Sequence, residues 1–339
     1  MELSLLPDEA LAHIMQFLDW HTLQNARLVS RKFFDVIESN NRHMQKPKVS
    51  VMHISSTNEE NIGEQVRAVF VIKDNKITTS SNVSIQKRPK VISLNIIELK
   101  YLLRRMDLFL IDQLYINIRG NSEIFDILNM YITSKTVVND LCIDIMNSPV
   151  FNSFMKFFTN LKRIHQIYFH NLCFGSQDIP TDISLPKIPM LKRFCISESK
   201  CTKFINSRMI GNLFINFPNI NEVLFHSERC DFNLEIVNTI QRRQKYDERG
   251  ACFHKNISLI SFFTPNPDPI QEYDKYFKNN INYLLESYYG FPQNEISFLV
   301  ASSLCSHCNK KDLISFAFIA KYRSACRDCT YHVNSMEVD

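Results

Sequence analysis

A short apolar pattern recurs six times between residues 111 and 262, and it constrains the fold more than any other feature. Each copy places apolar residues at its first, fourth and sixth positions. The central apolar residues are Leu114, Leu141, Ile167, Phe194, Val223 and Ile260, at intervals of 27, 26, 27, 29 and 37 residues. Such a pattern is typical of a strand, and each interval leaves room for a helix after it.

The segments between the copies have the apolar content of helices, notably residues 123–130, 151–158 and 210–214. One strand–helix unit is too small to bury its own apolar face, whereas stacked units bury these faces against each other. Parallel neighbouring strands need a crossover of about a dozen residues, which every interval provides. We therefore predict an α/β fold with six parallel strands side by side in chain order and with helices on the outer side.

The pattern and its spacing resemble leucine-rich repeats, whose period is about 20–29 residues. The asparagine that usually follows the strand is not reliably present, and the last interval is long. The resemblance implies degenerate repeats with a concave binding surface made by the strand residues between core positions. The candidate substrate-binding residues on that surface are Tyr115, Asn117, Asp144, Tyr168, His170 and His226. The alternative is an ordinary α/β domain whose strands happen to be evenly spaced.

The first forty residues are typical of three short helices. Pro7 suits the first position of a helix, and Ser30 can cap the third one. The first helix carries one apolar stripe, formed by Leu11, Ile14, Met15 and Leu18. A unit this small cannot bury all of its apolar surface alone. Part of that surface therefore faces either another protein or the domain that follows, as a helical cap would.

Residues 4–40 resemble the F-box family. The run Leu6-Pro7-Asp8-Glu9, the apolar helix ending in Leu18-Asp19, Leu23, and the close Leu28-Val29-Ser30-Arg31-Lys32-Phe33 keep the order and spacing of its motif. Phe33 stands where the family often has tryptophan, so an aromatic residue is kept. The resemblance implies docking onto a Skp-type adaptor, which is linked to a cullin. The implied adaptor contacts are Leu6, Pro7, Ile14, Leu18, Leu23, Leu28, Val29 and Phe33.

Two Cys-x-x-Cys pairs lie near the end of the chain. They are formed by Cys305 with Cys308 and by Cys326 with Cys329, with seventeen residues between the pairs. This spacing favours a Zn²⁺ site in which four thiolates complete the tetrahedron, a closed structural site. The apolar residues 313–320 are strand-like, consistent with a small zinc-stapled hairpin. The alternatives are reduced thiols or a redox pair.

Composition narrows the classes of function. The chain has 339 residues, a net charge of +4 and 6 glycines, none close enough together to form a phosphate-binding loop. His170 and His226 lack a partnered nucleophile, so we expect no catalytic residues and no enzyme. No run of about 18 apolar residues and no secretory leader is found, so we expect an intracellular protein, cytoplasmic or nuclear, with no membrane span.

These patterns divide the chain into four regions. We expect an F-box at 1–45, a strand-rich linker or first repeats at 46–100, a substrate-binding repeat region at 101–265, and a helical segment with the cysteine-pair module at 266–339. The preferred function is the substrate-recognition subunit of an SCF-type cullin-RING ubiquitin ligase, with an unidentified protein substrate. The alternative is a zinc-module protein that binds nucleic acid or acts as a scaffold, although the mild net charge makes nucleic acid the weaker choice.

Overall fold

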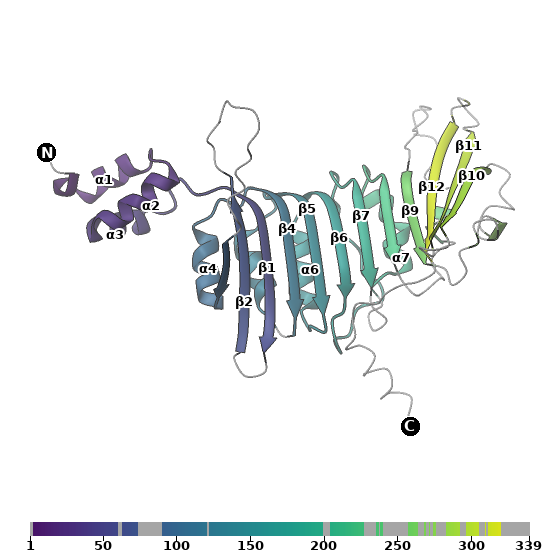
Figure 1. Ribbon diagram of the computed structural model, residues 1–339, viewed down its shortest axis with the longest axis horizontal. Coiled ribbons are helices and arrows are strands. Elements are labelled where there is room, and N and C mark those ends of the chain that lie inside the picture. Colours follow the sequence, from purple (N-terminus) through teal and green to yellow (C-terminus); the bar gives the residue numbers. More distant parts are fainter. Residues whose placement is uncertain are drawn as a thin grey trace, which may run out of the picture.

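The structure combines a small helical unit with one long sheet, and one face of that sheet is covered by helices (Figure 1). The computed structural model describes residues 3–59, 63–73, 90–120, 122–198, 204–226, 235–236, 238–239, 257–263, 268, 271, 274–275, 283–291, 296–304, 309 and 311–319. Among these residues, no helix has the length and apolarity needed to cross a membrane.

The helical unit consists of η1 (Leu3–Leu5), α1 (Asp8–Met15), α2 (Trp20–Val29) and α3 (Arg31–Ser39). The Asp19 side chain accepts a hydrogen bond from Thr22 N at the start of α2, at 2.9 Å. Ser30 Oγ accepts from Phe33 N at 3.2 Å, which confirms the predicted cap of the third helix. Pro7 lies one position before α1 rather than inside its first turn. The core of the unit is formed by Leu11, Met15, Leu23, Val36, Ile37 and Met44.

The sheet has twelve strands in the order β10-β11-β12-β9-β8-β7-β6-β5-β4-β1-β2-β3. Their bounds are β1 (Val49–Glu59), β2 (Gly63–Ile72), β3 (Lys90–Leu94), β4 (Leu110–Arg119), β5 (Val137–Met146), β6 (Arg163–Leu172), β7 (Arg193–Glu198), β8 (Glu222–His226), β9 (Ile257–Phe263), β10 (Tyr283–Phe291), β11 (Ile296–Leu304) and β12 (Lys311–Ile319). The helices beside it are α4 (Ile96–Arg104), α5 (Ile124–Tyr131), α6 (Phe151–Asn160), α7 (Ser207–Gly211) and α8 (Leu213–Asn216).

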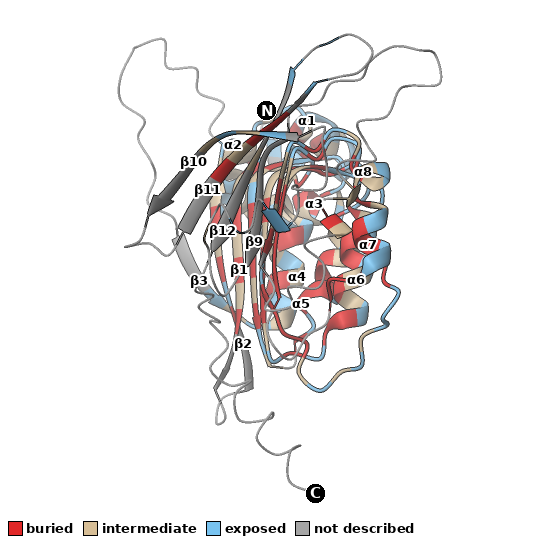
Figure 2. Cartoon of the chain, turned by 90° about the vertical axis from the view of Figure 1, so that its right-hand side faces the viewer, coloured by how far each residue is buried: buried red, intermediate tan, exposed pale blue. Residues whose placement is uncertain are grey.

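The predicted parallel arrangement is confirmed for the six patterned strands. β4 to β9 pair in parallel and in chain order, and α4 to α8 lie on one face of the sheet (Figure 2). The three apolar positions of each of the first five copies are all buried on the helix side, where apolar area is removed from water. Whether these units are leucine-rich repeats stays a prediction.

Phenylalanine fills the space between the sheet and its helices. On α6, Phe151, Phe154, Phe157 and Phe158 recur at helical spacing and are all buried. The Phe154 ring lies 5.5 Å from that of Phe169 on β6, in an edge-to-face arrangement that aromatic pairs favour. The apolar helix face predicted at residues 151–158 is therefore the packing face of α6.

Two regions differ in part from what the sequence predicts. Residues 46–100 are strand-rich as expected, and their described strands belong to the sheet, because β1 pairs in parallel with β4 while β2 and β3 continue the sheet in antiparallel order. In 266–339, the described residues are mainly β10, β11 and β12 rather than a helical segment, with helical residues only near 271–275. β12 pairs in parallel with β9, so these strands extend the main sheet instead of forming a separate hairpin module.

Glu38 at the end of α3 attaches the helical unit to α4. One of its carboxylate oxygens lies 3.1 Å from Arg27 Nε and in close contact with the Arg105 guanidinium. Tyr101 Oη donates to the other oxygen at 3.4 Å, and the Arg105 guanidinium lies 3.8 Å from the Tyr101 ring centroid. This cluster joins α2, α3 and α4.

Candidate functional site

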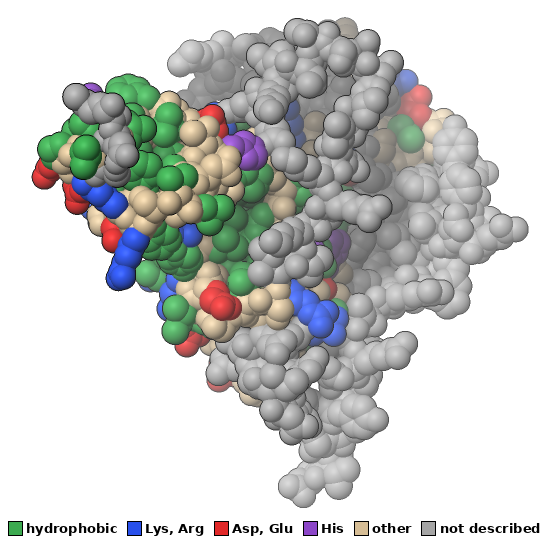
Figure 3. All heavy atoms as spheres, turned by 60° about the vertical axis from the view of Figure 1, so that its left-hand side comes forward, with side chains coloured by type: hydrophobic (Ala, Val, Ile, Leu, Met, Phe, Trp, Pro, Cys, Tyr) green, Lys and Arg blue, Asp and Glu red, His purple; other side chains and the backbone are tan. Residues whose placement is uncertain are grey.

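The helical unit keeps a group of large apolar side chains at its surface. Leu28 is 86% exposed and Val29 is 71% exposed, at the end of α2. Figure 3 shows hydrophobic side chains gathered over the helical unit. The exposed members are Leu3, Leu5, Ile14, Phe17, Leu28, Val29 and Phe34. An apolar group of this kind, on a unit whose own core is already filled, is a candidate protein interface.

The structure divides the predicted adaptor contacts into three groups. Pro7, Ile14, Leu28 and Val29 are exposed. Leu6, Leu18 and Phe33 are half-buried and pack against the core of the unit.

Leu23 is 1% exposed, so it is a core residue and its predicted contact with the adaptor is corrected. A family motif contains residues that form the core and residues that contact a partner, and burial in the structure is what distinguishes the two. Leu3, Leu5, Phe17 and Phe34 are also exposed, although the motif-based prediction does not include them. Phe17 lies just after the end of α1, and its place beside Leu18 in the apolar run could have identified it.

A second candidate surface is the sheet face that the helices leave uncovered. The register aligns Tyr115 on β4 with Cys142 on β5, Tyr168 on β6 and Cys195 on β7. On the other side of Tyr115, the His53 ring of β1 makes an edge-to-face contact at 4.3 Å. This row is aromatic and only partly covered, which suits recognition of another protein's side chains.

The next row along the strands is polar. Asn117, Asp144 and His170 align across β4, β5 and β6. The structure therefore brings together five of the six predicted substrate-binding residues. His226 pairs through its backbone with Ser197 on β7, and its side chain lies outside the described part of the chain.

Two buried polar groups in this row lack full hydrogen-bonding or charge partners. Asp144 is 7% exposed, and burial raises the pKa of its carboxyl group. A hydrogen bond from Asn171 Nδ2 at 3.3 Å and the charges of His170 and Arg119 lower that pKa only in part. Asn117 Oδ1 is buried without a hydrogen-bond partner among the described residues. Buried polar groups normally have partners, so a bound ligand could satisfy this oxygen.

The thiols of Cys142 and Cys195, in the neighbouring row, are not activated as nucleophiles. Burial raises the pKa of Cys142 to about 12 and that of Cys195 to about 11. The thiolate is the nucleophilic form of cysteine, and both groups are therefore protonated near neutral pH. Tyr168 Oη donates to Gln166 Oε1 at 2.7 Å and accepts from Arg193 at 2.8 Å, so its hydroxyl is held in place. This arrangement can bind and orient a partner.

The proposed zinc ligands Cys305, Cys308, Cys326 and Cys329 lie outside the described residues. Within the described part of the chain, no group of three or more His, Cys, Asp or Glu side chains could hold a metal ion. The zinc site stays a prediction from the spacing of the cysteines.

Comparison with known families identifies the helical unit. Residues 3–45 match the model of the F-box domain. Residues 3–45 therefore form an F-box domain, and domains of this kind typically bind a Skp-type adaptor and, through it, a cullin. No curated protein matches the chain.

Proposed function

We propose that this F-box protein is the substrate-recognition subunit of an SCF-type cullin-RING ubiquitin ligase. The exposed apolar residues of the helical unit bind the adaptor, and the open face of the sheet binds a protein substrate. The chain itself performs no chemistry, and its role is to hold the substrate near the ligase. This role places the protein in the cytoplasm or the nucleus.

The observation that carries the proposal is the pairing of a matched F-box domain with apolar surface that its own fold leaves unused. The core of the helical unit is complete without Leu28, Val29 and Ile14. Burying such side chains at an interface contributes about 25 cal/mol for each Å² of apolar surface removed from water. A few of them can act as the dominant contacts of an interface.

The sheet face supports the second half of the proposal. It presents His53 and Tyr115 on the adjacent strands β1 and β4, and aromatic residues are enriched at protein interfaces. The unsatisfied Asn117 oxygen and the buried Asp144 carboxyl are unfavourable in the free chain. Such groups are typical of binding sites, where a partner supplies the missing hydrogen bonds.

Capture of tagged protein from cells, followed by quantitative mass spectrometry, tests both halves. The double variant L28A/V29A should lose the adaptor and the cullin and keep the proteins held by the sheet. The variant Tyr115→Ala with His170→Ala should keep the adaptor and lose those proteins. A matched control, I97A/I215A, removes exposed apolar residues elsewhere and should keep both sets. Equal adaptor recovery with L28A/V29A and wild type would contradict the adaptor half of the proposal, and unchanged protein capture by the sheet variant would contradict the substrate half.

A further inference from the structure

A hollow lies at the junction between the helical unit and the sheet, and its lining shares no residue with the two surfaces described above. Its volume is about 450 Å³. Its walls come from the segment after α3, the end of α4, the residues before β4, and the end of α5 with the loop that follows. The lining residues are Asn41, Arg42, Lys46, Leu103, Arg104, Met106, Leu108, Phe109, Met130, Tyr131, Thr133, Lys135 and Thr136.

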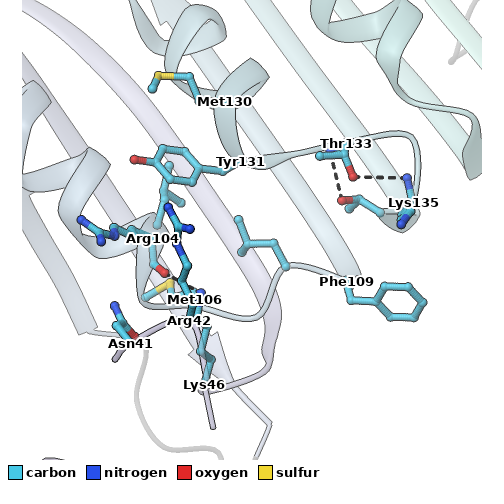
Figure 4. Close-up of a pocket in the computed structure, with 13 residues that line it drawn as sticks. Asn41, Arg42, Lys46, Arg104, Met106, Phe109, Met130, Tyr131, Thr133 and Lys135 are labelled. Atoms are coloured by element: carbon cyan, nitrogen blue, oxygen red, sulfur yellow. Dashed lines mark hydrogen bonds between the residues drawn. The ribbon is translucent and has the colours of Figure 1, made fainter. Parts of the chain in front are cut away.

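The charge of this junction groove has one sign. Arg42, Lys46, Arg104 and Lys135 line it, and none of its lining residues is acidic. Figure 4 shows Arg42, Lys46 and Arg104 together on one side and Lys135 with Phe109 on the opposite side. Cations on both sides of a concave surface focus a positive potential into it.

Only one of these four cationic side chains, that of Lys46, has a structural role as a helix cap. Lys46 Nζ donates to the Arg104 carbonyl oxygen at 2.8 Å, at the end of α4. The side chains of Arg42, Arg104 and Lys135 form no ion pair among the described residues. The nearby Asp107 carboxylate accepts a hydrogen bond from Phe109 N at 3.0 Å, and its charge acts on Lys46.

The surroundings of Lys46 disfavour its charged form, mainly through burial. Burial lowers the pKa of its ammonium group, the neighbouring Asp107 raises it, and the charge of Arg104 lowers it further. A bound anion would relieve both burial and repulsion. The residues that line the groove supply no counter-charge to Arg42, Arg104 or Lys135, and a partner could bring one.

Apolar side chains complete the groove. Met130 is 64% exposed and Phe109 is 56% exposed at its rim, while Leu103, Met106 and Leu108 are buried beneath. A concave site with an apolar floor and a few convergent polar groups is suited to a side chain of matching character. The combination fits carboxylates beside a hydrophobic residue better than a nucleic-acid backbone, which needs a longer basic track.

We propose that the junction groove binds an acidic peptide segment of another protein, with its carboxylates on Arg42, Arg104 and Lys135 and an apolar side chain against Met130 and Phe109. The inference does not depend on adaptor binding or on the open sheet face. It adds a third docking site, at the boundary between the F-box and the sheet.

Fluorescence polarisation with the purified 339-residue chain tests this site. The probe is a labelled peptide of glutamates around a central leucine and phenylalanine, and its partner probe has glutamine in place of every glutamate. We expect saturable binding of the acidic probe that weakens as salt is raised. The variant R42E/K135E should weaken it by roughly tenfold or more. The matched variant K187E/K192E makes the same charge change on an exposed loop before β7 and should bind like wild type.

A second variant distinguishes loss of binding from loss of folding. Met130→Glu changes one exposed rim residue, so the chain should keep its thermal unfolding midpoint and still lose affinity for the acidic probe. Equal binding of the acidic and glutamine probes would overturn the proposal. Unchanged affinity in R42E/K135E, or tighter binding of a single-stranded oligonucleotide than of the peptide, would also overturn it.

Discussion

Glu38 is one of the residues that join the F-box to the helix beside the sheet. It is only partly exposed and has cationic neighbours from α2 and from the end of α4. Burial raises the pKa of Glu38, but the hydrogen bond from Arg105 and the charges of Arg105 and Arg27 outweigh it, so the pKa is lowered. Sequence gave no sign of this cluster, because its members are far apart in the chain. By contrast, the Ser30 cap was predictable, since both partners lie within one turn.

Glu38→Gln should destabilise the attachment of the F-box. The change leaves Arg27 and Arg105 without a counter-charge in a half-buried place, at a cost of roughly 1–3 kcal/mol. Chemical unfolding of the variant and of the exposed control Glu123→Gln measures the difference. The lowered folded pKa means that stability from Glu38 is complete above its ordinary value of 4.5 and is lost as the pH falls through the folded pKa. The variant and wild type should therefore converge in strongly acidic solution, and a constant difference down to low pH would contradict this account.

Asp144→Asn should raise the thermal unfolding midpoint at neutral pH. Burial raises the pKa of the Asp144 carboxyl, so the ionised form is disfavoured in the folded chain. That penalty is present at neutral pH and disappears as the pH falls and the carboxyl is protonated, so the gain should shrink toward about pH 4. The control Asp140→Asn, on the same strand, should change little. A destabilised Asp144→Asn variant at pH 7 would show that the carboxylate is a net stabilising group.

At the scale of elements, the parallel strands were the most predictable part. Their three apolar positions recur at a spacing that suits one strand followed by one crossover. This spacing predicted the chain-order arrangement of β4 to β9. The end strands were less predictable. β10 and β11 form an antiparallel pair whose sequences lack the repeating pattern, and their place beside β12 depends on long-range pairing. The residues on the open face of the sheet were predictable, because side chains along a strand alternate between its two faces. The burial of Asp144 on that face was not predictable from this alternation.

Phe154 of α6 should be among the most costly positions to truncate. It is fully buried, and its ring lies 5.5 Å from those of both Phe169 and Phe174. Phe154→Ala should cost about 3–5 kcal/mol, because the cavity left behind cannot collapse fully. Phe109→Ala, at an exposed position, should cost less than about 1 kcal/mol. Equal losses in the two variants, measured by denaturant unfolding, would show that α6 does not pack against the sheet as described.

At the scale of the whole molecule, the chain places its F-box at one end of a long sheet (Figure 1). The junction cluster at Glu38 and the junction groove both lie where the two parts meet. The open sheet face extends away from that point along successive strands. The family of the helical unit could be predicted from motif residues, while the groove could not, because its walls come from four separate segments.

The C-terminal cysteines carry a further prediction. We expect one Zn²⁺ per chain, held by Cys305, Cys308, Cys326 and Cys329, with a structural role. Metal analysis of reduced, purified protein should find it, and the variant C305S/C308S should lose it. Cys142→Ser, at a half-buried position of the sheet face, should keep the metal. A chelator should loosen the C-terminal region first and leave adaptor binding intact. Absence of zinc from the wild-type chain would remove this site from the account.

Calorimetric titration of the purified chain with a Skp-type adaptor tests the central claim most directly. We predict saturable one-to-one binding that is lost, or weakened by more than about tenfold, in L28A/V29A. The double variant L6A/P7A should also abolish binding, since Pro7 is exposed and Leu6 packs on the core beside it. The control I97A/I215A should bind like wild type. No measurable binding by the folded wild-type chain, or equal affinity in L28A/V29A, would contradict the assignment of the helical unit as the adaptor-binding surface.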